Sequence, residues 1–317
     1  MQTNKNLATK APQYKEGSMR AVKIAITLML VSILAFCLSA CGPSGSGGGA
    51  SFSPPSSVKT AEFTQVTQGS SSAGVDTSHI SEGYVAAVAI NNSALKFQVV
   101  GNGVTNTYDL SSDGTPLIAP LSHGNGSYTF KIMQNTSGNR YVELFSSTVS
   151  VKLESEFAPF LVPNTYCNYT PNSACVSQAR SLTANASTQG EAAGAILEWI
   201  INNIRYDNQK AVELSSGSGY VPNPDSTLSS KTGVCFDYAS LAAAMLRSQG
   251  IPCKIITGYV SNNIYHAWNM VYTDGTWKTV SFELKGNQWE LIDTTLAASG
   301  PGATIGDGGT YVERYVY

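Results

Sequence analysis

The most constraining feature of the chain is a change of pattern between residues 190 and 317. In EAAGAILEWIINNIRYD, apolar residues recur every three or four positions, which predicts an amphipathic helix with one buried face. A second helix is predicted to begin at Cys235 and to end at Gly250, just before Pro252. The segments CKIITGYV, YHAWNMVY, TWKTVSFEL, QWELIDTT and TYVERYVY then follow as strands. Helices followed by a sheet are typical of an α+β domain.

A different pattern precedes this region. LKFQVV and VTNTYDL surround the turn GNG and predict a β-hairpin, and SYTFKIM and RYVELFSSTVSVKL repeat the design with a longer loop. Helical periodicity is absent from this stretch. We therefore expect a small antiparallel β-sandwich-like domain over residues 82–155, followed by the α+β domain over residues 156–317.

The N-terminus has the pattern of an export signal. Arg20 and Lys23 precede IAITLMLVSILAF, an apolar run too short for a comfortable membrane span. The run ends in LSAC, which resembles the bacterial lipobox, whose cysteine is lipidated and becomes the mature N-terminus. Residues 1–41 are thus predicted to be a lipoprotein signal peptide, with Cys41 lipidated. A plain signal peptide or an uncleaved anchor is the alternative, and translation from Met19 or a long basic segment would each explain residues 1–18.

The composition agrees with export. Residues 42–81 begin with GPSGSGGGASFSPPSS and are predicted to be a flexible linker. Charged residues make up only 13% of the chain, which suits a secreted or surface protein. Residues 1–40 carry a net charge of +4 and the remainder −6, so no basic surface for nucleic acid is expected. We expect lipid anchoring at the extracellular face of a bacterial cell membrane.

Four cysteines follow Cys41, and outside the cytosol they are free to pair. Cys167 and Cys175 flank the turn-rich NYTPNSA, which makes them a possible disulfide, although four cysteines allow three pairings. A bond between Cys235 and Cys253 would block Cys235 as a nucleophile. We interpret Cys253 as a buried residue.

Cys235 has the placement of a reactive thiol. The thiolate is the nucleophilic form, and a helix N-terminus lowers the pKa of a thiol because free N–H groups favour negative charge. A base is also needed, held in place by a third group. His266 is the one histidine in the second half of the chain, and on a strand it points with Trp268 and Met270. Asp293 lies two predicted strands later.

These residues lie in motifs that resemble a known family. GVCFDYASLAAAMLRSQGIPCKIITGY, HAWNMV and WELIDTT, within residues 190–300, resemble the transglutaminase-like superfamily. The resemblance implies a papain-like fold in which Cys235 is the nucleophile, His266 the base and Asp293 the residue that orients the histidine. The whole layout resembles surface lipoproteins of Gram-positive bacteria. Two departures are visible: 26 residues separate His266 from Asp293, which predicts one extra strand, and Met270 stands where an acidic residue is common.

The expected fold is therefore α+β, a papain/transglutaminase-like core with an N-terminal antiparallel β-sandwich-like domain. The resemblance implies thiol acyl chemistry on peptide or glutamine carbonyls, by a protease, an amidase or a cross-linker. The partner would be a protein or peptide, cell-wall peptides included. The alternative is a non-catalytic surface module that uses the same cleft for binding. The three histidines are scattered, and phosphate-loop and HExxH motifs are absent, so neither a metal nor a cofactor is expected. Asp237 is interpreted as a stabiliser of the helix start.

Overall fold

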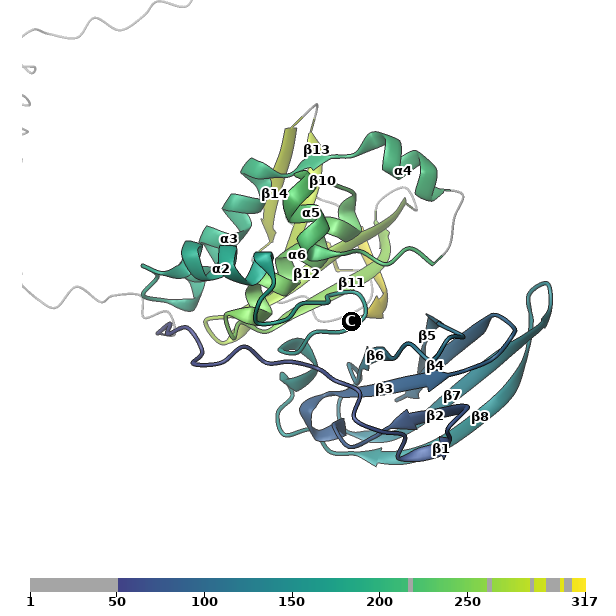
Figure 1. The fold of residues 1–317 in the computed structure, drawn as a ribbon. Coiled ribbons are helices and arrows are strands. Elements are labelled where there is room, and N and C mark those ends of the chain that lie inside the picture. Colours follow the sequence, from purple (N-terminus) through teal and green to yellow (C-terminus); the bar gives the residue numbers. More distant parts are fainter. Residues whose placement is uncertain (1–50, 216–218, 261–263, 286–287, 295–302, 305–309) are drawn as a thin grey trace, which may run out of the picture. The chain divides into compact units, whose positions relative to one another are not determined.

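The computed structural model describes residues 51–215, 219–260, 264–285, 288–294, 303–304 and 310–317, and side chains are described outside residues 281–310 (Figure 1). The predicted signal peptide, its apolar run and Cys41 lie outside these residues. Within the described ranges, no helix has the length and apolarity needed to cross a membrane.

The first part of the described chain consists of two antiparallel four-stranded sheets, in the orders β1-β2-β3-β6 and β5-β4-β7-β8. The strands are β1 (Gln68–Ser70), β2 (Ala73–Asp76), β3 (Tyr84–Ala89), β4 (Leu95–Gly101), β5 (Val104–Leu110), β6 (Leu117–Pro120), β7 (Gly126–Ser137) and β8 (Arg140–Val151), with a 3-10 turn, η1 (Ile80–Glu82), before β3. Buried residues alternate with less buried ones along β4, as expected for a strand with one face on a core. Both hairpins predicted from the sequence, β4–β5 and β7–β8, are present.

The flexible linker predicted over residues 42–81 is wrong for its second half. β1 and β2 pair with each other, and β2 pairs with β3. Val75 is fully buried, and the carboxylate of Asp76 accepts hydrogen bonds from the backbone N–H groups of Thr64 and Gln65. Burial of one valine and saturation of one carboxylate thus order a stretch whose Gly and Ser content suggests a linker. Residues 42–50 lie outside the described ranges.

The second part begins with helices. They are a 3-10 turn, η2 (Ala158–Phe160), and α2 (Ala174–Thr183), α3 (Gln189–Asn203), α4 (Asn208–Ser215), α5 (Pro224–Ser230) and α6 (Cys235–Ser248), with two short paired strands, β9 (Arg205–Tyr206) and β10 (Thr232–Gly233), between them. The sequence predicted α3 and α6. α3 begins at a capping box, in which the Thr188 side chain accepts from the N–H of Glu191 while Glu191 accepts from that of Thr188. α2, α4 and α5 were not predicted.

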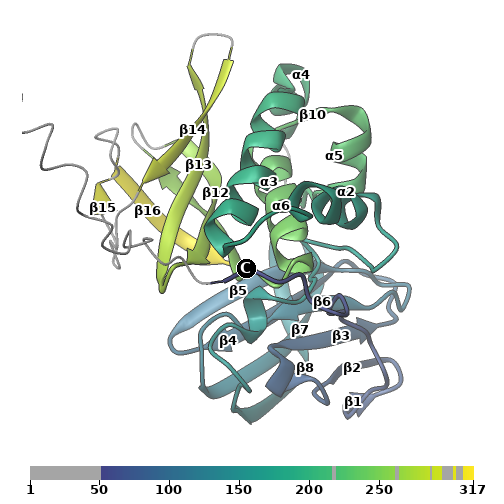
Figure 2. The same cartoon turned by 90° about the vertical axis from the view of Figure 1, so that its left-hand side faces the viewer.

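A six-stranded sheet follows in the order β14-β13-β12-β11-β16-β15. Its strands are β11 (Cys253–Val260), β12 (Ile264–Thr273), β13 (Thr276–Lys285), β14 (Gln288–Thr294), β15 (Ala303–Thr304) and β16 (Thr310–Val316). All its pairings are antiparallel. β13 is the extra strand predicted between the histidine and the aspartate. α3 and α6 lie side by side against β12 (Figure 2).

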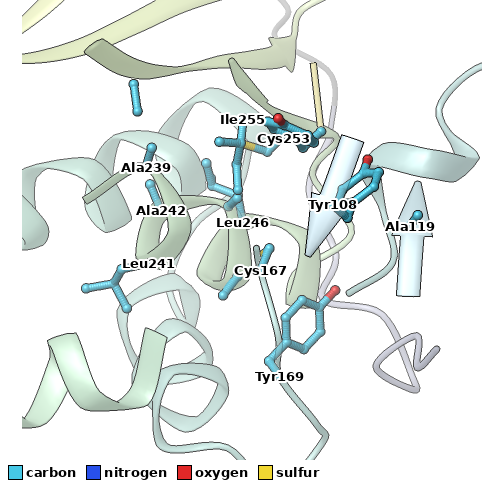
Figure 3. Close-up of a cluster of buried hydrophobic side chains, with 14 of the residues drawn as sticks. Tyr108, Ala119, Cys167, Tyr169, Ala239, Leu241, Ala242, Leu246, Cys253 and Ile255 are labelled. Carbon is cyan, nitrogen blue, oxygen red and sulfur yellow. The ribbon is translucent and has the colours of Figure 1, made fainter. Parts of the chain in front are cut away.

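One hydrophobic core runs through both parts (Figure 3). Tyr108, from β5, packs against Tyr166 and Tyr317 at ring distances of 5.7 and 5.9 Å. The side chain of Asn106 donates to the carbonyl oxygen of Val316 at 3.3 Å, and that of Ser122 donates to the same oxygen at 2.7 Å. β5 therefore contacts the strand β16 that completes the second sheet.

Candidate active site

Cys235 is the first residue of α6, as the sequence predicts. Val234, just before it, is extended, and its N–H donates to the carboxylate of Asp237 at 2.8 Å. Gly233 leaves no room for a side chain, because a Cβ there would lie 2.6 Å from the Cβ of Asp237. The order Gly-Val-Cys-Phe-Asp thus sets a tight, capped helix start that places the thiol at the free N–H end of the helix.

His266 lies near the beginning of β12, and the strand's two faces are occupied as predicted. Asn269 faces α6, because its side-chain amide donates to the carbonyl oxygen of Ala239 at 3.0 Å. Trp268 points the other way, into a small buried cluster with Ile256 and Tyr311. The ring of His266 stacks on Trp268 at 6.4 Å with 15° between the planes, so the two share a face.

Cys235 and His266 line the same cleft, which has a volume of about 740 Å³. Volumes of 300–1,000 Å³ are usual for ligand sites. One wall comes from β11 and β12, and the other from α4 and the segment around Tyr220. Two of the three residues that the sequence assigned to the site therefore line one cleft.

Burial sets the protonation of this pair. Burial raises the pKa of the Cys235 thiol, against hydrogen bonds from the backbone N–H groups of Ala267 and Phe236 that lower it, and the charge of Asp237 raises it further. Burial lowers the pKa of His266 to about 4. The predicted lowering of the thiol pKa is therefore wrong in this structure, because desolvation outweighs the helix N-terminus. At neutral pH both effects favour the uncharged thiol and the uncharged imidazole.

Asp293, the third predicted member, is placed only through its backbone. On β14 it pairs with Val280 of β13, which pairs in turn with Asn269 of β12. It therefore lies two strands from His266 and at the level of a residue three positions further along β12. Its side chain lies outside the described residues, so its role as the orienting group stays a prediction.

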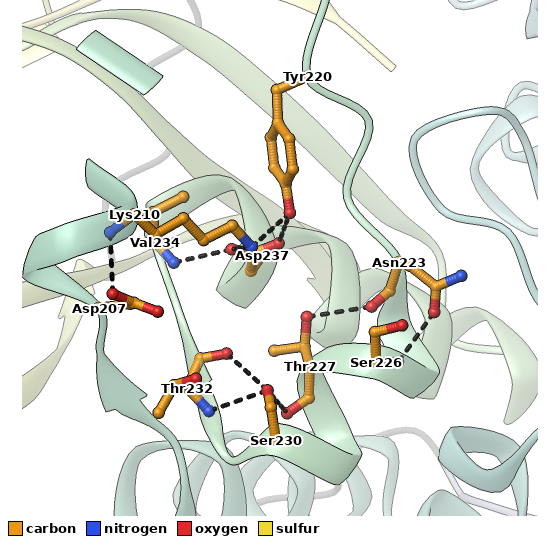
Figure 4. Close-up of polar contacts among 10 residues, drawn as sticks. All are labelled: Asp207, Lys210, Tyr220, Asn223, Ser226, Thr227, Ser230, Thr232, Val234 and Asp237. Atoms are coloured by element: carbon orange, nitrogen blue, oxygen red, sulfur yellow. Dashed lines mark hydrogen bonds and ion pairs between the residues drawn. The ribbon is translucent and has the colours of Figure 1, made fainter. Parts of the chain in front are cut away.

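A buried ionic network supports the start of α6 (Figure 4). Asp237 is fully buried, and its carboxylate binds the ammonium group of Lys210 at 2.6 Å and accepts a hydrogen bond from the hydroxyl group of Tyr220. The ammonium group of Lys210 also lies 4.6 Å from the centre of the Tyr220 ring. Asp237 was predicted to stabilise the helix start, and its bond to Val234 does so. The sequence does not point to its partners Lys210 and Tyr220, because they precede it by 27 and 17 residues.

The other three cysteines after Cys41 are buried and free. The possible disulfide between Cys167 and Cys175 is absent from the structure. Cys175 is held instead by Asp225, which accepts a hydrogen bond from its backbone N–H at 2.8 Å and another from its thiol. Burial raises the pKa of Cys253 to about 12 and that of Cys167 to about 11. Cys253 is thus the buried residue that the sequence suggested, and it is not bonded to Cys235.

Within the described residues there is no group of three or more histidine, cysteine or acidic side chains placed to hold a metal ion. His123 is half-buried in a turn of the first part, and burial lowers its pKa.

Known proteins resemble the region of the chain that contains Cys235 and His266. Residues 176–282 match the family model of the transglutaminase-like superfamily, which confirms the resemblance for this region. The UPF0252 protein MJ1282 of Methanocaldococcus jannaschii is 33% identical over 91 residues, which is 26% of each chain. Mouse kyphoscoliosis peptidase is 31% identical over 129 residues, 37% of this chain and 18% of the relative. The chain thus matches about a quarter and about a fifth of the length of these relatives.

Solved structures with similar chains are more distant in sequence. A structure from Cytophaga hutchinsonii is 17% identical with a TM-score of 0.38, and covers 73% of each chain. Red sea bream transglutaminase is 10% identical with a TM-score of 0.25, and the match covers 62% of this chain and 48% of that one.

Proposed function

We propose that this protein is a thiol acyl-transfer enzyme in which Cys235 attacks a peptide or glutamine carbonyl. The observation that supports the proposal is that Cys235, at the start of α6, and His266 line the same cleft. The match of residues 176–282 to the transglutaminase-like superfamily supports it independently. Asp293 is proposed as the group that orients His266.

The chemistry starts from the neutral pair. His266 takes the thiol proton as the sulfur of Cys235 bonds to the carbonyl carbon, and the carbonyl oxygen becomes an oxyanion. The N–H of Cys235, at the first position of α6, has no partner within the helix and can donate to that oxygen. Collapse breaks the carbon–nitrogen bond, His266 returns the proton to the leaving amine, and a thioester remains.

An oxyanion hole usually has a second donor, and Tyr220 is a hydroxyl-bearing residue of the cleft lining. The hydroxyl group of Tyr220 already donates its hydrogen bond to Asp237, so it is not available to an oxyanion. Its ring still lines the cleft.

The fate of the thioester separates two activities. Attack by water gives a peptidase or amidase, and attack by an amine gives a cross-linker. To test this, the full chain is incubated with a glutamine-bearing protein and a labelled primary amine, with Cys235→Ala as control. Mass spectrometry then distinguishes deamidated, cleaved and amine-labelled products. Absence of all three, together with absence of a trapped thioester, would contradict the proposal.

One observation favours a non-catalytic binding module as the second candidate. The neutral resting pair is less activated than a thiolate–imidazolium pair. Alkylation by iodoacetamide at pH 6–8 separates the candidates. A catalytic thiol slows in His266→Ala, because that change removes its base, whereas a purely structural thiol reacts at the same slow rate in both proteins.

We also propose that the protein is anchored by a lipid on Cys41 at the extracellular face of the membrane. The support is the order of basic residues, apolar run and LSAC in the sequence. Two acyl chains hold a protein stably at a bilayer. Incorporation of a labelled fatty acid in cells tests the idea, because Cys41→Ala should lose the label. Retention of label in that variant would contradict lipidation at this residue.

A further inference from the structure

The side chains that line the cleft around Cys235 are mostly apolar or aromatic. No lysine, arginine, aspartate or glutamate is among the described residues that form it. Apart from Cys235 and His266, most of the lining is aromatic or aliphatic. The main side chains are those of Tyr166, Tyr220, Phe236, Ile264, Tyr265 and Tyr317.

Of the five tyrosines that line the cleft, three have hydroxyl groups that the protein itself binds. The hydroxyl group of Tyr220 donates a hydrogen bond to the carboxylate of Asp237. The hydroxyl group of Tyr265 donates a hydrogen bond to the Oγ1 of Thr257 at 2.9 Å. The hydroxyl group of Tyr317 is also hydrogen-bonded to the Thr257 side chain. With these groups occupied, what remains for a ligand is largely apolar ring surface.

The rings are held in place by packing. Phe236, next to the nucleophile, packs against Tyr166 at 5.2 Å and against Tyr220 at 6.5 Å. Tyr108, from the β-sandwich, backs Tyr166 and Tyr317 from behind. The lining is therefore a supported surface, and the sandwich helps to shape it.

The edge of the cleft beside His266 is apolar and open to solvent. Ile264 is 58% exposed and Tyr265 is 50% exposed, and they directly precede His266 on β12. Single exposed apolar residues are ordinary on protein surfaces. Here two adjacent ones border the reacting residues, and covering them with a ligand would remove apolar surface from water.

From this lining we propose that the cleft selects substrates that carry a neutral, apolar or aromatic side chain next to the carbonyl attacked by Cys235. The proposal rests on the function proposed above and names its substrate class. A charged side chain in this position would lose its water without gaining a counter-charge, which disfavours acidic and basic residues. The volume of about 740 Å³ fits a peptide segment with such a side chain.

Acetyl-aminoacyl acyloxymethyl ketones with phenylalanine, leucine, glutamine, lysine or aspartate test the selection. The sulfur of Cys235 displaces the acyloxy group as a carboxylate, the thiol proton goes to His266 or buffer, and the thioether that forms is permanent. On the full chain we expect the phenylalanine and leucine probes to label Cys235 at least about tenfold faster than the aspartate and lysine probes. Iodoacetamide, which has no side chain, is the reference for thiol reactivity. Equal rates across the five probes, or faster labelling by a charged probe, would overturn the proposal.

A charge introduced at the edge sharpens the test. Relative to iodoacetamide labelling of the same variant, Ile264→Lys should slow the phenylalanine probe and speed the aspartate probe. Val142→Lys is the matched control, since Val142 is 50% exposed, close to the 58% of Ile264, but lies on β8, outside the cleft lining. If both variants shift the preference equally, the selection is not made at this edge.

The proposal and the function it rests on fail differently. If the protein transfers acyl groups without a side-chain preference, the proposed function stands and the proposed substrate selection is wrong. If it prefers certain side chains but forms no acyl product, the selection stands and the proposed function is wrong. A binding experiment needs no chemistry at all: Cys235→Ala should bind acetyl-phenylalanine amide more tightly than acetyl-aspartate amide in ligand-observed NMR. Equal binding of the two amides would also overturn the selection.

Discussion

A cysteine and a charged residue lie at or just beyond each end of α6, yet the environments of the two ends are opposite. At the first end, Cys235 opens onto a cleft, and the ion pair of Lys210 with Asp237 supports the helix start. At the other end, Arg247 is only 2% exposed, and Cys253 follows as a buried thiol.

The charges serve different purposes at the two ends. Arg247 donates to three backbone carbonyl oxygens, those of Val162, Cys253 and Tyr317, at 2.8, 2.9 and 3.0 Å. It thereby joins three separate segments of chain. The pair of Lys210 and Asp237 instead fixes a single turn, the one that holds the nucleophile. The comparison teaches that one helix can be anchored to the rest of the fold at one end while its other end presents a reactive side chain to a cleft.

The largest contrast is expected between the two cysteines. Cys235→Ala should lower acyl transfer by more than about 10⁴-fold, because it removes the nucleophile. Cys253→Ala should leave turnover within a few-fold, because Cys253 lies in the core. In the unmodified chain, competitive alkylation followed by peptide mapping should label Cys235 far ahead of Cys253. Equal labelling of the two thiols would erase the contrast between the helix ends.

Asp293→Asn is expected to have the next largest effect. An amide favours the wrong tautomer of His266 and does not stabilise an imidazolium, a change that costs about 10⁴ in turnover in a serine protease. We expect a clear loss, smaller than that of Cys235→Ala, with the melting temperature nearly unchanged. Thioester trapping and a thermal melt measure both quantities. Full activity would remove Asp293 from the site, and Glu290 and Glu283 would be tested next.

Arg247→Met should lower stability by about 3–5 kcal/mol, because buried carbonyl groups lose their charged donor. Urea unfolding gives the free energy. A loss of unfolding free energy below about 1 kcal/mol would show that Arg247 does not anchor the C-terminal end of α6.

Lys210→Met is the matched variant at the other end. Lys210 is 28% exposed, so the cost in stability should be smaller, about 1–2 kcal/mol. Asp237 loses its counter-charge there, and its negative charge already raises the thiol pKa. The pH profile of Cys235 alkylation should therefore move to higher pH in Lys210→Met and stay in place in Arg247→Met.

A pH dependence of stability is expected from the cleft end of α6 and not from the other end. The pKa of His266 is about 4 when folded and about 6.5 when unfolded, so the unfolded chain binds more protons between these values. The stabilisation is complete above pH 6.5 and is lost as the pH falls to 4, by up to about 3 kcal/mol. Urea unfolding from pH 7 to 4 measures it, and His266→Gln should flatten the curve. An unchanged slope in that variant would place the titration elsewhere.

Much of the fold follows from patterns in the sequence. Alternation along β4 and β7 predicts the hairpins, and apolar spacing predicts α3. The short helices did not follow, because their stability comes from contacts far along the chain. α5 begins with Asn223 and Pro224, a usual helix start, but it lies in a Ser- and Pro-rich stretch, and its Asp225 also caps α2 through the N–H groups of Ala174 and Cys175.

The candidate site shows the same division. Cys235 and His266 were found because each lies in a local motif within its own element. Lys210 was missed, since a salt bridge across 27 residues leaves no local signal. The direction of the thiol pKa was also missed, because a helix N-terminus can be recognised in a sequence but the depth of burial around it cannot.

The position of β16 has a consequence for how the cleft comes to exist. β16 pairs with β11 through Ile256 and Val316, about sixty residues apart, and Tyr317, directly after it, forms part of the cleft wall. Such long-range pairing pays the entropy of loop closure before it gains contacts, so it forms late in folding. During refolding, we expect native helix signal to appear before selective labelling of Cys235, and simultaneous recovery would contradict this order. A folding intermediate that already holds the thiol would thus lack the pocket that selects its substrate, so selection among substrates would appear only when the sheet is complete.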